Sequence, residues 1–370
     1  MRVLLLAGEE SGLLYANKIK DMLAGHEVRG YADYGFRTAD LAVMGFGAVL
    51  RRLGYFLGVK KTMERAIDEW RPDVVCTIDY PGMNLKLAAY AKAKGIRTVH
   101  VVCPQVWAWK EGRIPRIEAS VDRLCCFFPF EPALFKPGFA EFVGHPLAEG
   151  FGRQAGECAT PRDAAPSGRL VAVLPGSRIG EIERNFPALL EVIRILGSEF
   201  GGSVKFVVPA ANEGAYRRLS SMVAGAGAMP SPPEVRLGGA RETLVAAECA
   251  VVASGTATLE AALARCPTVL VYRVSAALAW FARRVIKGVR HIGLANVVWE
   301  KSGAKGEEPM PELLQEDFTA DGVAALLRRW LSDPQERAAA VARLDAVVRK
   351  LETGESAFDR IVALILGRRD

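Results

Sequence analysis

The sequence predicts an α/β protein made of two doubly wound, Rossmann-like domains that face each other across a cleft. Three observations predict this class. Short, continuous apolar runs alternate with helical patterns along the 370 residues, and such runs are typical of parallel strands buried on both faces. The length fits about two to three domains. The segment 152–169, GRQAGECATPRDAAPSGR, is polar and rich in Gly, Pro and Ala, as expected of a linker.

The apolar runs give the expected strands in chain order. In the first half they lie at residues 3–7, 74–78, 98–102, 123–128 and 141–143. In the second half they lie at residues 170–174, 204–209, 249–253 and 268–272. Helical stretches between the strands imply βαβ crossovers, and three helical patterns follow at 321–331, 334–351 and 356–366. We therefore expect an N-terminal domain at 1–155, joined by C-terminal helices at 346–370, and a second domain at 166–345.

Composition excludes several classes of protein. Hydrophobic residues make up 50% and charged residues 24% of the chain, which excludes a wholly disordered or collagen-like chain. No apolar run approaches the roughly 20 residues that span a bilayer, and the N-terminus lacks a signal-peptide pattern. The net charge of +6 is too mild to argue for a nucleic-acid partner. Seven cysteines without a CxxC pair and four scattered histidines predict structural thiols, a reduced cytosolic compartment and no metal site.

Two motifs of the first domain follow strands, where ligands bind in open parallel sheets. The first strand leads into AGEESG at 7–12, whose glycines permit close backbone approach and whose helix-start amides favour an anion. A tight strand–helix turn without a ligand explains this motif equally well. The strand at 74–78 ends at Asp79, where a carboxylate facing a cleft suits a general base. A carboxylate that caps the following helix is the more ordinary interpretation.

An aromatic turn follows the third expected strand. Trp107 and Trp109 stand two residues apart after Cys103-Pro104-Gln105. Two such rings in a loop are predicted to bury against something. They either pack on a sugar or acyl group or cover the edge of the domain.

The second domain carries two motifs with the chemistry of a diphosphate site. LPGSR at 174–178 joins a Gly-Ser turn to Arg178, a permanently charged guanidinium that clamps phosphate oxygens well. ASGTATLE at 253–260 combines small residues, hydroxyls and helix-start amides that bind phosphate oxygens. Glu260 is placed to accept from ribose hydroxyls, although a carboxylate near the positive end of a helix is favourable without any ligand. The motif lacks the GKS or GKT ending of a P-loop.

Two segments combine an apolar stripe with a basic side. They are FGAVLRRLGYFLGVKKTM at 46–63 and AALAWFARRVIKGVRHIGL at 276–294. Such helices are suited to a membrane interface, where rings enter the acyl boundary and cations meet anionic lipid heads. Helices that face the core with a solvated basic side are the alternative. The expected membrane and acyl contacts are Leu53, Phe56, Leu57, Trp280, Phe281, Arg283 and Arg284.

Taken together, these motifs resemble those of the lipid-A-disaccharide synthase family. The resemblance rests on the motifs AGEESG, LPGSR and ASGTATLE together with six further segments, all in the family's order. These segments are LAVMGF at 41–46, PDVVCTIDYPGMNL at 72–85, VWAWK at 106–110, FPFE at 128–131, FVGHPL at 142–147 and PELLQED at 311–317. It implies a fold of the GT-B type and an inverting, metal-independent glycosyltransferase without a cofactor. The implied enzyme transfers 2,3-diacylglucosamine from its UDP derivative to 2,3-diacylglucosamine 1-phosphate, releasing UDP. It implies a cytoplasmic protein peripheral to the inner, anionic face of the cytoplasmic membrane.

The resemblance also assigns roles to residues. The catalytic residues are Asp79, as the base, and Arg178, which stabilises the leaving UDP. The residues implied to bind the UDP-sugar are Gly176, Ser177, Ser254, Gly255, Thr256, Ala257, Thr258, Glu260 and Asn296. The residues expected to contact the acceptor or a sugar are Gly8, Glu9, Ser11, Gly12 and Trp107. The chain departs from the family's usual pattern at Leu13, Gly82-Met83, Cys103, Gln105 and Ala295.

The residues leave rival functions open. One is another UDP-sugar enzyme of similar architecture, either a cell-wall glycosyltransferase or a UDP-N-acetylglucosamine epimerase. A second is a catalytically silent paralogue that binds lipid, and a third is a soluble enzyme whose apolar-basic helices belong to the core. A homodimer through the C-terminal helices is likewise left open.

Overall fold

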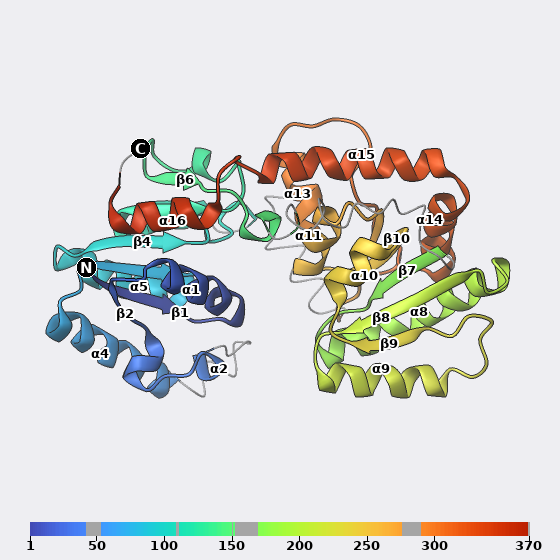
Figure 1. Ribbon diagram of the computed structural model, residues 1–370, viewed down its shortest axis with the longest axis horizontal. Helices are drawn as coiled ribbons and strands as arrows, with labels where there is room; N and C mark the ends of the chain where they lie inside the picture. Colours follow the sequence, from blue (N-terminus) through green and yellow to red (C-terminus); the bar gives the residue numbers. More distant parts are fainter. Residues whose placement is uncertain (42–52, 109–110, 150, 152–168, 276–289, 369–370) are drawn as a thin grey trace. The chain divides into compact units, whose positions relative to one another are not determined.

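The computed structural model describes residues 1–41, 53–108, 111–149, 151, 169–275 and 290–368, and this part of the chain forms two compact units. Unit 1 comprises Met1–Pro146 and Leu351–Asp370, and unit 2 comprises Leu147–Lys350. Each unit contains one six-stranded parallel sheet with helices packed on it (Figure 1). The predicted α/β class, with two doubly wound sheets, is therefore confirmed. Most of the predicted linker, 152–168, lies outside the described residues.

The sheet of unit 1 runs in the order β2-β1-β3-β4-β5-β6, and every neighbouring pair is parallel. Its strands are β1 (Arg2–Ala7), β2 (Glu27–Arg29), β3 (Val74–Ile78), β4 (Arg97–Val101), β5 (Arg123–Cys126) and β6 (Ala140–Phe142). The chain leaves β1 for β2 on one side and returns to β3 on the other. The strand order therefore reverses between β1 and β3, and ligands bind at such a switch point in open α/β sheets.

Helices cover both faces of this sheet. They are α1 (Glu10–Met22), α2 (Thr38–Leu41), α4 (Leu53–Trp70), α5 (Pro81–Ala93), α6 (Ile114–Ser120) and α16 (Ala357–Leu366). Val3 and Leu5 of β1 pack in one core cluster with α1 and α16. Leu4 and Leu6 pack in another with α4 and α5. Successive side chains of a strand point to opposite faces, so this two-sided burial explains the continuous apolar run.

The sheet of unit 2 runs in the order β12-β11-β10-β7-β8-β9, again with parallel neighbours. Its strands are β7 (Arg169–Leu174), β8 (Val204–Ala210), β9 (Glu234–Leu237), β10 (Cys249–Ala253), β11 (Thr268–Tyr272) and β12 (Glu312–Leu314). Numbered from the first strand of the unit, this is the 3-2-1-4-5-6 order of dinucleotide-binding folds read from the other edge. Its switch point lies between β7 and β10.

The helices of unit 2 are α8 (Ile179–Glu199), α9 (Glu213–Gly225), α10 (Ala240–Ala246), α11 (Thr256–Leu263), α13 (Leu294–Lys301), α14 (Ala320–Ser332) and α15 (Pro334–Leu351). On one face of the sheet, Val171 and Val173 of β7 pack with Phe186 of α8 and Leu327 of α14. None of the described helices, in either unit, is long and apolar enough to cross a membrane.

Three strands escaped sequence analysis, and all three lie at sheet edges. They are β2, β9 and β12. Their residues are partly or fully exposed. An edge strand has no need of a continuous apolar run, because it lacks a neighbour on one side and full cover on its faces. The predicted strand at 74–78 and the last three helical patterns are confirmed with the same or nearly the same bounds.

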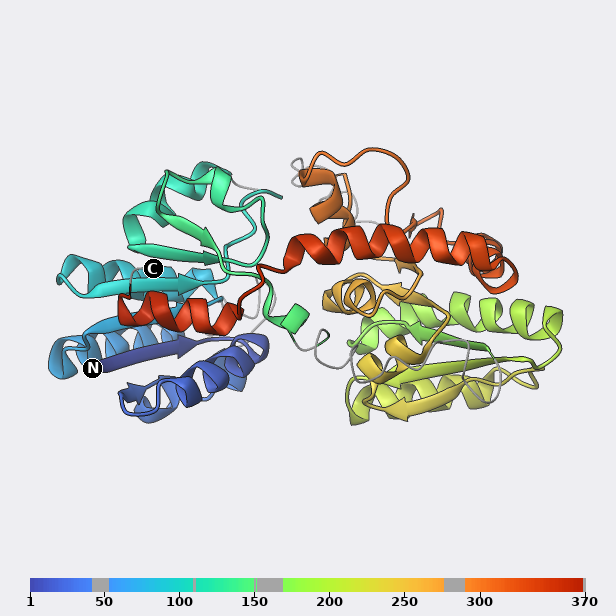
Figure 2. The same cartoon turned by 45° about the horizontal axis from the view of Figure 1, so that its top comes forward.

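The final helix, α16, belongs to unit 1. Figures 1 and 2 show it lying beside β4 and α1. Phe358 and Ile361 are buried in the cluster that also contains Ile19 of α1. The Arg97 guanidinium, at the start of β4, donates to the carbonyl oxygens of Leu364 and Ile365. The apolar side of α16 is therefore covered by the chain's own sheet.

Candidate active site

Asp79 stands at the switch point of unit 1, at the carboxyl end of β3. Its backbone amide donates to the carbonyl of Val101 on β4, at 2.9 Å. Asp79 and Tyr80 have φ values of 49° and 50°, a left-handed conformation that non-glycine residues adopt rarely and at a cost. Two such residues in succession turn the chain sharply from β3 into α5. The end of β3 and this turn thus fix the position of the carboxylate, and Tyr80 rather than Asp79 is the residue at the N-cap of α5.

The Asp79 carboxylate is half-buried, and among the described residues one of its two oxygens accepts a hydrogen bond. Oδ1 accepts from the backbone amide of Tyr80 at 2.8 Å, while Oδ2 has no hydrogen bond to any residue that the structure describes. Burial raises the pKa of Asp79 above its usual value, and the Tyr80 amide partly offsets this effect. An acid with a raised pKa and one open oxygen is suited to accept a proton from a substrate hydroxyl.

The AGEESG turn lies next to Asp79, because β1 and β3 are neighbours and Ala7 pairs with Ile78. Burial raises the pKa of Glu9 first, and the negative charge of Asp79 raises it further, so the two carboxylates repel. A Cβ on Gly8 would lie 2.4 Å from the Tyr80 ring. Only glycine therefore allows the ring to pack on the turn. Gly12 faces the carbonyl of Ile78 with more room, at 3.5 Å from an added Cβ.

A buried amide that sequence analysis did not single out holds this turn together. The Nδ2 of Asn84 donates to the carbonyls of Leu6, Ile78 and Asp79, at 3.2, 3.0 and 2.8 Å. Its Oδ1 accepts from the hydroxyl of Tyr31 at 2.7 Å. Asn84 is fully buried and ties the carboxyl end of β1 to that of β3. The available signal was a polar residue in the first turn of the helix, between the apolar residues Met83 and Leu85.

The LPGSR motif lies at the switch point of unit 2 and leads from β7 into α8. Gly176 has a φ of 121°, and an added Cβ would lie 2.7 Å from the Cβ of Glu181. Glu181 folds back over the turn, because its Oε2 accepts from the amides of Ser177 and Arg178 at 3.3 and 3.4 Å. Its Oε1 accepts from Nη1 of Arg178 at 2.7 Å. The Arg178 side chain remains 65% exposed, which leaves the rest of its guanidinium open to a ligand.

The ASGTATLE motif follows β10, the neighbour of β7 in the sheet. Ser254 donates its amide to Val271 of β11 at 3.3 Å, and the Thr258 hydroxyl donates to the Gly255 carbonyl at 2.8 Å. The amides of Gly255, Thr256 and Ala257 have no acceptor among the described residues, as expected where a helix begins. These residues are at least partly exposed. The turn therefore presents free N–H groups at the start of α11, the usual backbone setting for phosphate.

Glu260 and Asn296, the two remaining residues expected to bind the UDP-sugar, lie in different surroundings. Burial raises the pKa of Glu260, while the positive charge of Arg241 opposes the shift. Asn296 is fully buried. Its amide donates to the Met310 carbonyl at 2.7 Å and to Oε1 of Glu312 at 2.8 Å, and its Oδ1 accepts from the Met310 amide at 3.0 Å. The donors and acceptor of Asn296 are thus used in joining α13 to β12.

Trp107 lies in the protein interior, and a hydrogen-bonded cluster surrounds it. Its ring is 4% exposed, packs edge-on against Phe130 at 5.5 Å between centroids, and donates Nε1 to Oε1 of Glu131 at 3.0 Å. Glu131 was missed by sequence analysis as an individual residue. Its Oε2 accepts from the amides of Phe127 and Phe128 at 3.2 and 3.1 Å. Burial raises the pKa of Glu131 to about 8. Trp107 therefore covers the inside of the turn rather than an open surface.

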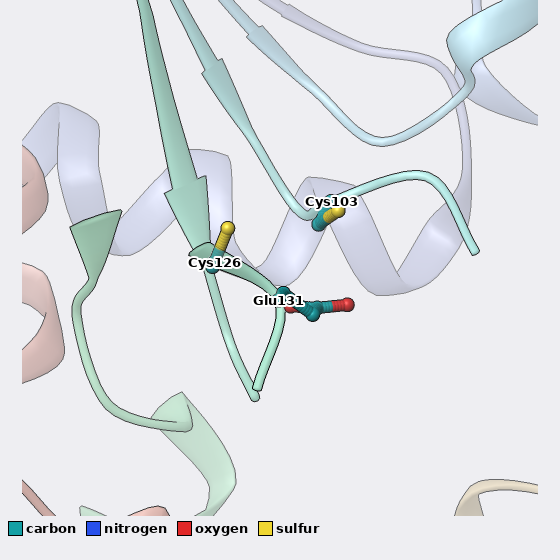
Figure 3. A group of neighbouring side chains, drawn as sticks. All are labelled: Cys103, Cys126 and Glu131. Atoms are coloured by element: carbon teal, nitrogen blue, oxygen red, sulfur yellow. The ribbon is translucent and has the colours of Figure 1, made fainter. Parts of the chain in front are cut away.

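Two thiols complete that cluster. Figure 3 shows Cys103 after β4, Cys126 at the end of β5 and Glu131 in the turn that follows, and their potential ligand atoms lie within 4.8 Å of one another. Metal ions bind thiolates rather than thiols. The contact with Cys103 and burial raise the pKa of the Cys126 thiol well above its usual value, and the Glu131 oxygens already accept three N–H groups. The residues fit a hydrogen-bonded core better than a metal centre.

The expected membrane contacts lie mostly outside the described residues. Trp280, Phe281, Arg283 and Arg284 belong to 276–289, and the side chain of Leu53 is likewise not described. On α4, Phe56 is 8% exposed and belongs to a core cluster. Leu57 is 59% exposed. Of these two, only Leu57 offers its side chain to a membrane in this structure.

Each unit thus gathers its predicted residues at its own switch point. In unit 1 the structure brings Asp79 together with Glu9 and Gly8, whereas Trp107 is buried and nothing is described of the Ser11 side chain. In unit 2 it brings the LPGSR and ASGTATLE turns to neighbouring strands, whereas Asn296 is buried at the junction of α13 and β12. The cleft between the units, with Asp79 opposite Arg178, stays a prediction.

Sequence comparisons match nearly the whole chain to one family. A family model described as lipid-A-disaccharide synthetase matches residues 4–366. A lipid-A-disaccharide synthase of Geobacter metallireducens is 34% identical over 384 residues, covering 99% of this chain and 96% of the relative. One from Thiobacillus denitrificans is 38% identical over 339 residues, covering 89% of this chain and 86% of the relative.

Solved structures share the fold at low sequence identity. The S. aureus MnaA–UDP complex matches with a TM-score of 0.63 and 11% identity, covering 100% of this chain and 97% of that one. Acinetobacter baumannii MurG matches with a TM-score of 0.58 and 12% identity, covering 99% of each chain. A Neisseria meningitidis UDP-GlcNAc 2-epimerase bound to UDP-GlcNAc matches with a TM-score of 0.60 and 10% identity, covering 99% of this chain and 100% of that one. At such identities the likeness concerns the fold alone.

Proposed function

The chain belongs to the lipid-A-disaccharide synthase family, and from this membership we propose that it is a glycosyltransferase that makes the lipid A disaccharide. The proposed donor is UDP-2,3-diacylglucosamine, and the acceptor is 2,3-diacylglucosamine 1-phosphate. The products are the β-1,6-linked disaccharide 1-phosphate and UDP. The observation that carries the proposal is the family match over residues 4–366, because that range includes the strand-end turns of both units.

The proposed reaction is a single displacement with inversion. The 6-hydroxyl oxygen of the acceptor attacks the anomeric carbon of the donor sugar and gives its proton to the open Oδ2 of Asp79. The bond from the anomeric carbon to the diphosphate oxygen breaks, and its electron pair leaves with UDP. Half-burial and a raised pKa support Asp79 in this role, since a general base works best when its pKa approaches the working pH.

Charge that grows on the departing UDP needs a positive partner. The exposed part of the Arg178 guanidinium and the free amides of Gly255, Thr256 and Ala257 are proposed to supply it. Donors held in place before the reaction stabilise developing charge without reorganisation, which is commonly the largest catalytic term. Because Glu181 already occupies one side of Arg178, the proposal has this carboxylate orient the guanidinium toward the diphosphate.

The acyl chains of both substrates place the reaction at a lipid surface. We propose peripheral attachment to the inner, anionic face of the cytoplasmic membrane through Leu57 of α4 and the basic segment 276–294. Leu57 is an exposed large apolar side chain, and Lys61 follows on the same helix. Interfacial helices combine an apolar contact with cations that meet anionic head groups.

Product analysis tests the proposed function directly. The purified protein is incubated with UDP-2,3-diacylglucosamine and 2,3-diacylglucosamine 1-phosphate in mixed micelles, and the lipids are identified by mass spectrometry. The expected product is the disaccharide 1-phosphate, formed in equal amount to UDP. Unacylated UDP-N-acetylglucosamine serves as the control donor. Turnover of the unacylated donor but not of the acylated one would instead indicate an epimerase or a cell-wall transferase. If neither donor gives UDP release, the protein is a silent lipid-binding protein.

A further inference from the structure

A basic groove in unit 1 is left unexplained by the residues discussed so far. It lies between α5 and α6 and has a volume of about 400 Å³. Its lining consists of Pro81, Gly82, Leu85, Lys86, Ala89, Arg113, Arg116, Ile117 and Ser120. Three of these residues are cationic, and none carries a carboxylate. A groove of one sign of charge focuses the field on whatever enters it and favours an anion.

Within the described part of the chain, the side chains of the three cations are not paired with a carboxylate. No ion pair or hydrogen bond joins the side-chain nitrogens of Lys86, Arg113 or Arg116 to another residue that the structure describes. Elsewhere in unit 1, Arg360 pairs with both Glu141 and Glu355, and Lys92 pairs with Asp122. Grouping cations without a counter-charge costs repulsion, and an anionic ligand would remove that cost.

The floor of the groove is apolar. Leu85 and Ile117 are 7% and 1% exposed, and the hydroxyl of Ser120 is occupied, because it donates to the Arg116 carbonyl at 2.7 Å. Reduced access of water beside such a floor strengthens the attraction between the cations and a bound anion. A phosphate attached to a larger, partly apolar body therefore fits this groove better than a small hydrated ion does.

The groove begins beside the candidate base. Pro81 and Gly82 line it and are the first two residues of α5, directly after Asp79 and Tyr80. Asn84 holds this start of the helix against β1 and β3. A ligand anchored in the groove would thus extend toward Asp79 across the beginning of α5.

From this juxtaposition we infer that Lys86, Arg113 and Arg116 bind a phosphate monoester, namely the 1-phosphate of the acceptor. The inference rests on the proposed function, which supplies an acceptor with a phosphate at one end of the sugar and the attacking hydroxyl at the other. Phosphate in the groove places that hydroxyl near Asp79. The three cations then act as positioning residues for the acceptor and leave the donor untouched.

Steady-state kinetics of the Arg113→Gln/Arg116→Gln double variant test the inference. Loss of charge-assisted hydrogen bonds is expected to raise the acceptor KM roughly 10- to 100-fold, with the donor KM and the kcat at saturating acceptor nearly unchanged. The same measurements on the acceptor without its phosphate should show a poor wild-type KM that the double variant does not worsen. Lys86→Gln is expected to have a smaller effect of the same kind.

The matched control is Lys20→Gln, which removes an exposed cation of α1 that forms no ion pair with a described residue and should leave both KM values unchanged. Far-ultraviolet circular dichroism confirms that each variant is folded. An unchanged acceptor KM in the double variant, or an equal loss on both acceptors, would overturn the inference. So would a loss of binding to anionic vesicles with normal kinetics on micellar substrates, which would make the groove a lipid-surface contact.

A calorimetric titration with inorganic phosphate at low salt separates this inference from the proposed function. Saturating UDP is present throughout, so that the proposed diphosphate site of unit 2 is already occupied. Wild type and the Lys20→Gln control are expected to bind phosphate, and the double variant is expected to lose this binding. If wild type shows no transferase activity, the proposed function fails, and this titration still decides whether the groove is an anion site. Equal phosphate binding by wild type and double variant would overturn the site itself.

Discussion

At the scale of single residues, the partial burial that suits Asp79 to its proposed role costs stability. Burial raises its pKa, so the folded protein binds the Asp79 proton more tightly than the unfolded chain does. The stability that this contributes is fully present below the unfolded pKa and is lost as the pH rises through the folded pKa. At neutral pH the ionised carboxylate therefore lowers the free energy of unfolding.

Asp79→Asn is predicted to lower turnover while leaving the protein at least as stable. Asn retains an oxygen for the Tyr80 amide but bears no charge to desolvate and accepts no proton. Loss of a general base lowers kcat roughly 10²- to 10⁴-fold, and the urea midpoint at pH 7 should stay the same or rise. UDP release and urea unfolding measure the two effects. Asp21→Asn, at an exposed position of α1, is the control and should change neither. Near-normal turnover in Asp79→Asn would remove Asp79 as the base.

Sequence analysis placed Asp79 directly after a strand and Arg178 in the turn between a strand and a helix, as the structure does, but could not assign partners to side chains. The pattern of an apolar strand that ends in a polar residue is visible in the sequence. The hydrogen bonds that bury Asn296 and Trp107 are not, because they depend on Glu312 and Glu131, which are distant in the chain or on another loop. Buried polar groups must be paired, and only the fold determines which groups meet.

At the scale of elements, the turn before α8 depends on the absence of a side chain at one position. Gly176→Ala is predicted to destabilise the protein by about 1–3 kcal/mol, since the new Cβ would lie 2.7 Å from that of Glu181 and the φ of 121° is strained for alanine. Displacement of Glu181 would also release Arg178, so the affinity for UDP should fall. Urea unfolding and a calorimetric titration with UDP measure both effects.

A glycine elsewhere in unit 2 provides the control for this change. Gly225 ends α9, and an added Cβ there would meet nothing within 4 Å. Gly225→Ala should be neutral or stabilising, because alanine reduces the entropy of the unfolded chain. Equal stability of the two variants would show that the turn before α8 adapts to a side chain.

Helix α4 divides its apolar residues between the core and the surface. Leu57→Ser is predicted to lower binding to anionic vesicles several-fold without loss of stability, since this side chain is 59% exposed and a buried CH₂ contributes roughly 0.8 kcal/mol to lipid binding. Co-sedimentation at low salt measures the partition. Leu14→Ser, at a leucine of α1 that is 72% exposed, is the control. An equal loss of vesicle binding in both variants would mean that Leu57 of α4 is not a specific membrane contact.

The elements themselves were largely predictable, with a physical limit at the edges of the sheets. Strands such as β3 and β10 are buried along their whole length, so their apolar runs are unbroken and were found with correct bounds. The residues of β9, EVRL, are mostly exposed and carry charge, so the sequence looks like a loop. Pairing with β8, which is a tertiary interaction, makes it a strand.

At the scale of the whole molecule, unit 1 is completed by the last residues of the chain. Phe358 of α16 is 4% exposed, lies 6.2 Å from Tyr15 between ring centroids, and has the Lys18 ammonium 3.9 Å from its ring centre. Phe358→Ala is predicted to destabilise unit 1 by about 3–5 kcal/mol. Amide hydrogen exchange should report faster opening of β1 and α1, with no change in the core of unit 2.

Amide hydrogen exchange also measures the control variant and shows the outcome that would contradict this prediction. Leu14→Ala removes an exposed side chain of α1 and should leave exchange in β1 unchanged. Uniformly faster exchange across both units in Phe358→Ala would show that the two units unfold as one. Sequence analysis predicted both the two-sheet architecture and C-terminal helices that join the N-terminal domain. The contacts that hold α16 there, between residues more than 250 positions apart, are visible only in the structure.

The interruption of unit 1 by unit 2, between Pro146 and Leu351, has a consequence for synthesis on the ribosome. Domains generally fold as they emerge, at roughly 5–20 residues per second. The nascent N-terminal sheet must therefore wait roughly tens of seconds, while the whole of unit 2 is translated, before the helix that covers it leaves the exit tunnel. Through that interval the apolar face formed by Val3, Ile19 and Val99 lacks its final cover, which makes the incomplete chain a natural client for chaperones.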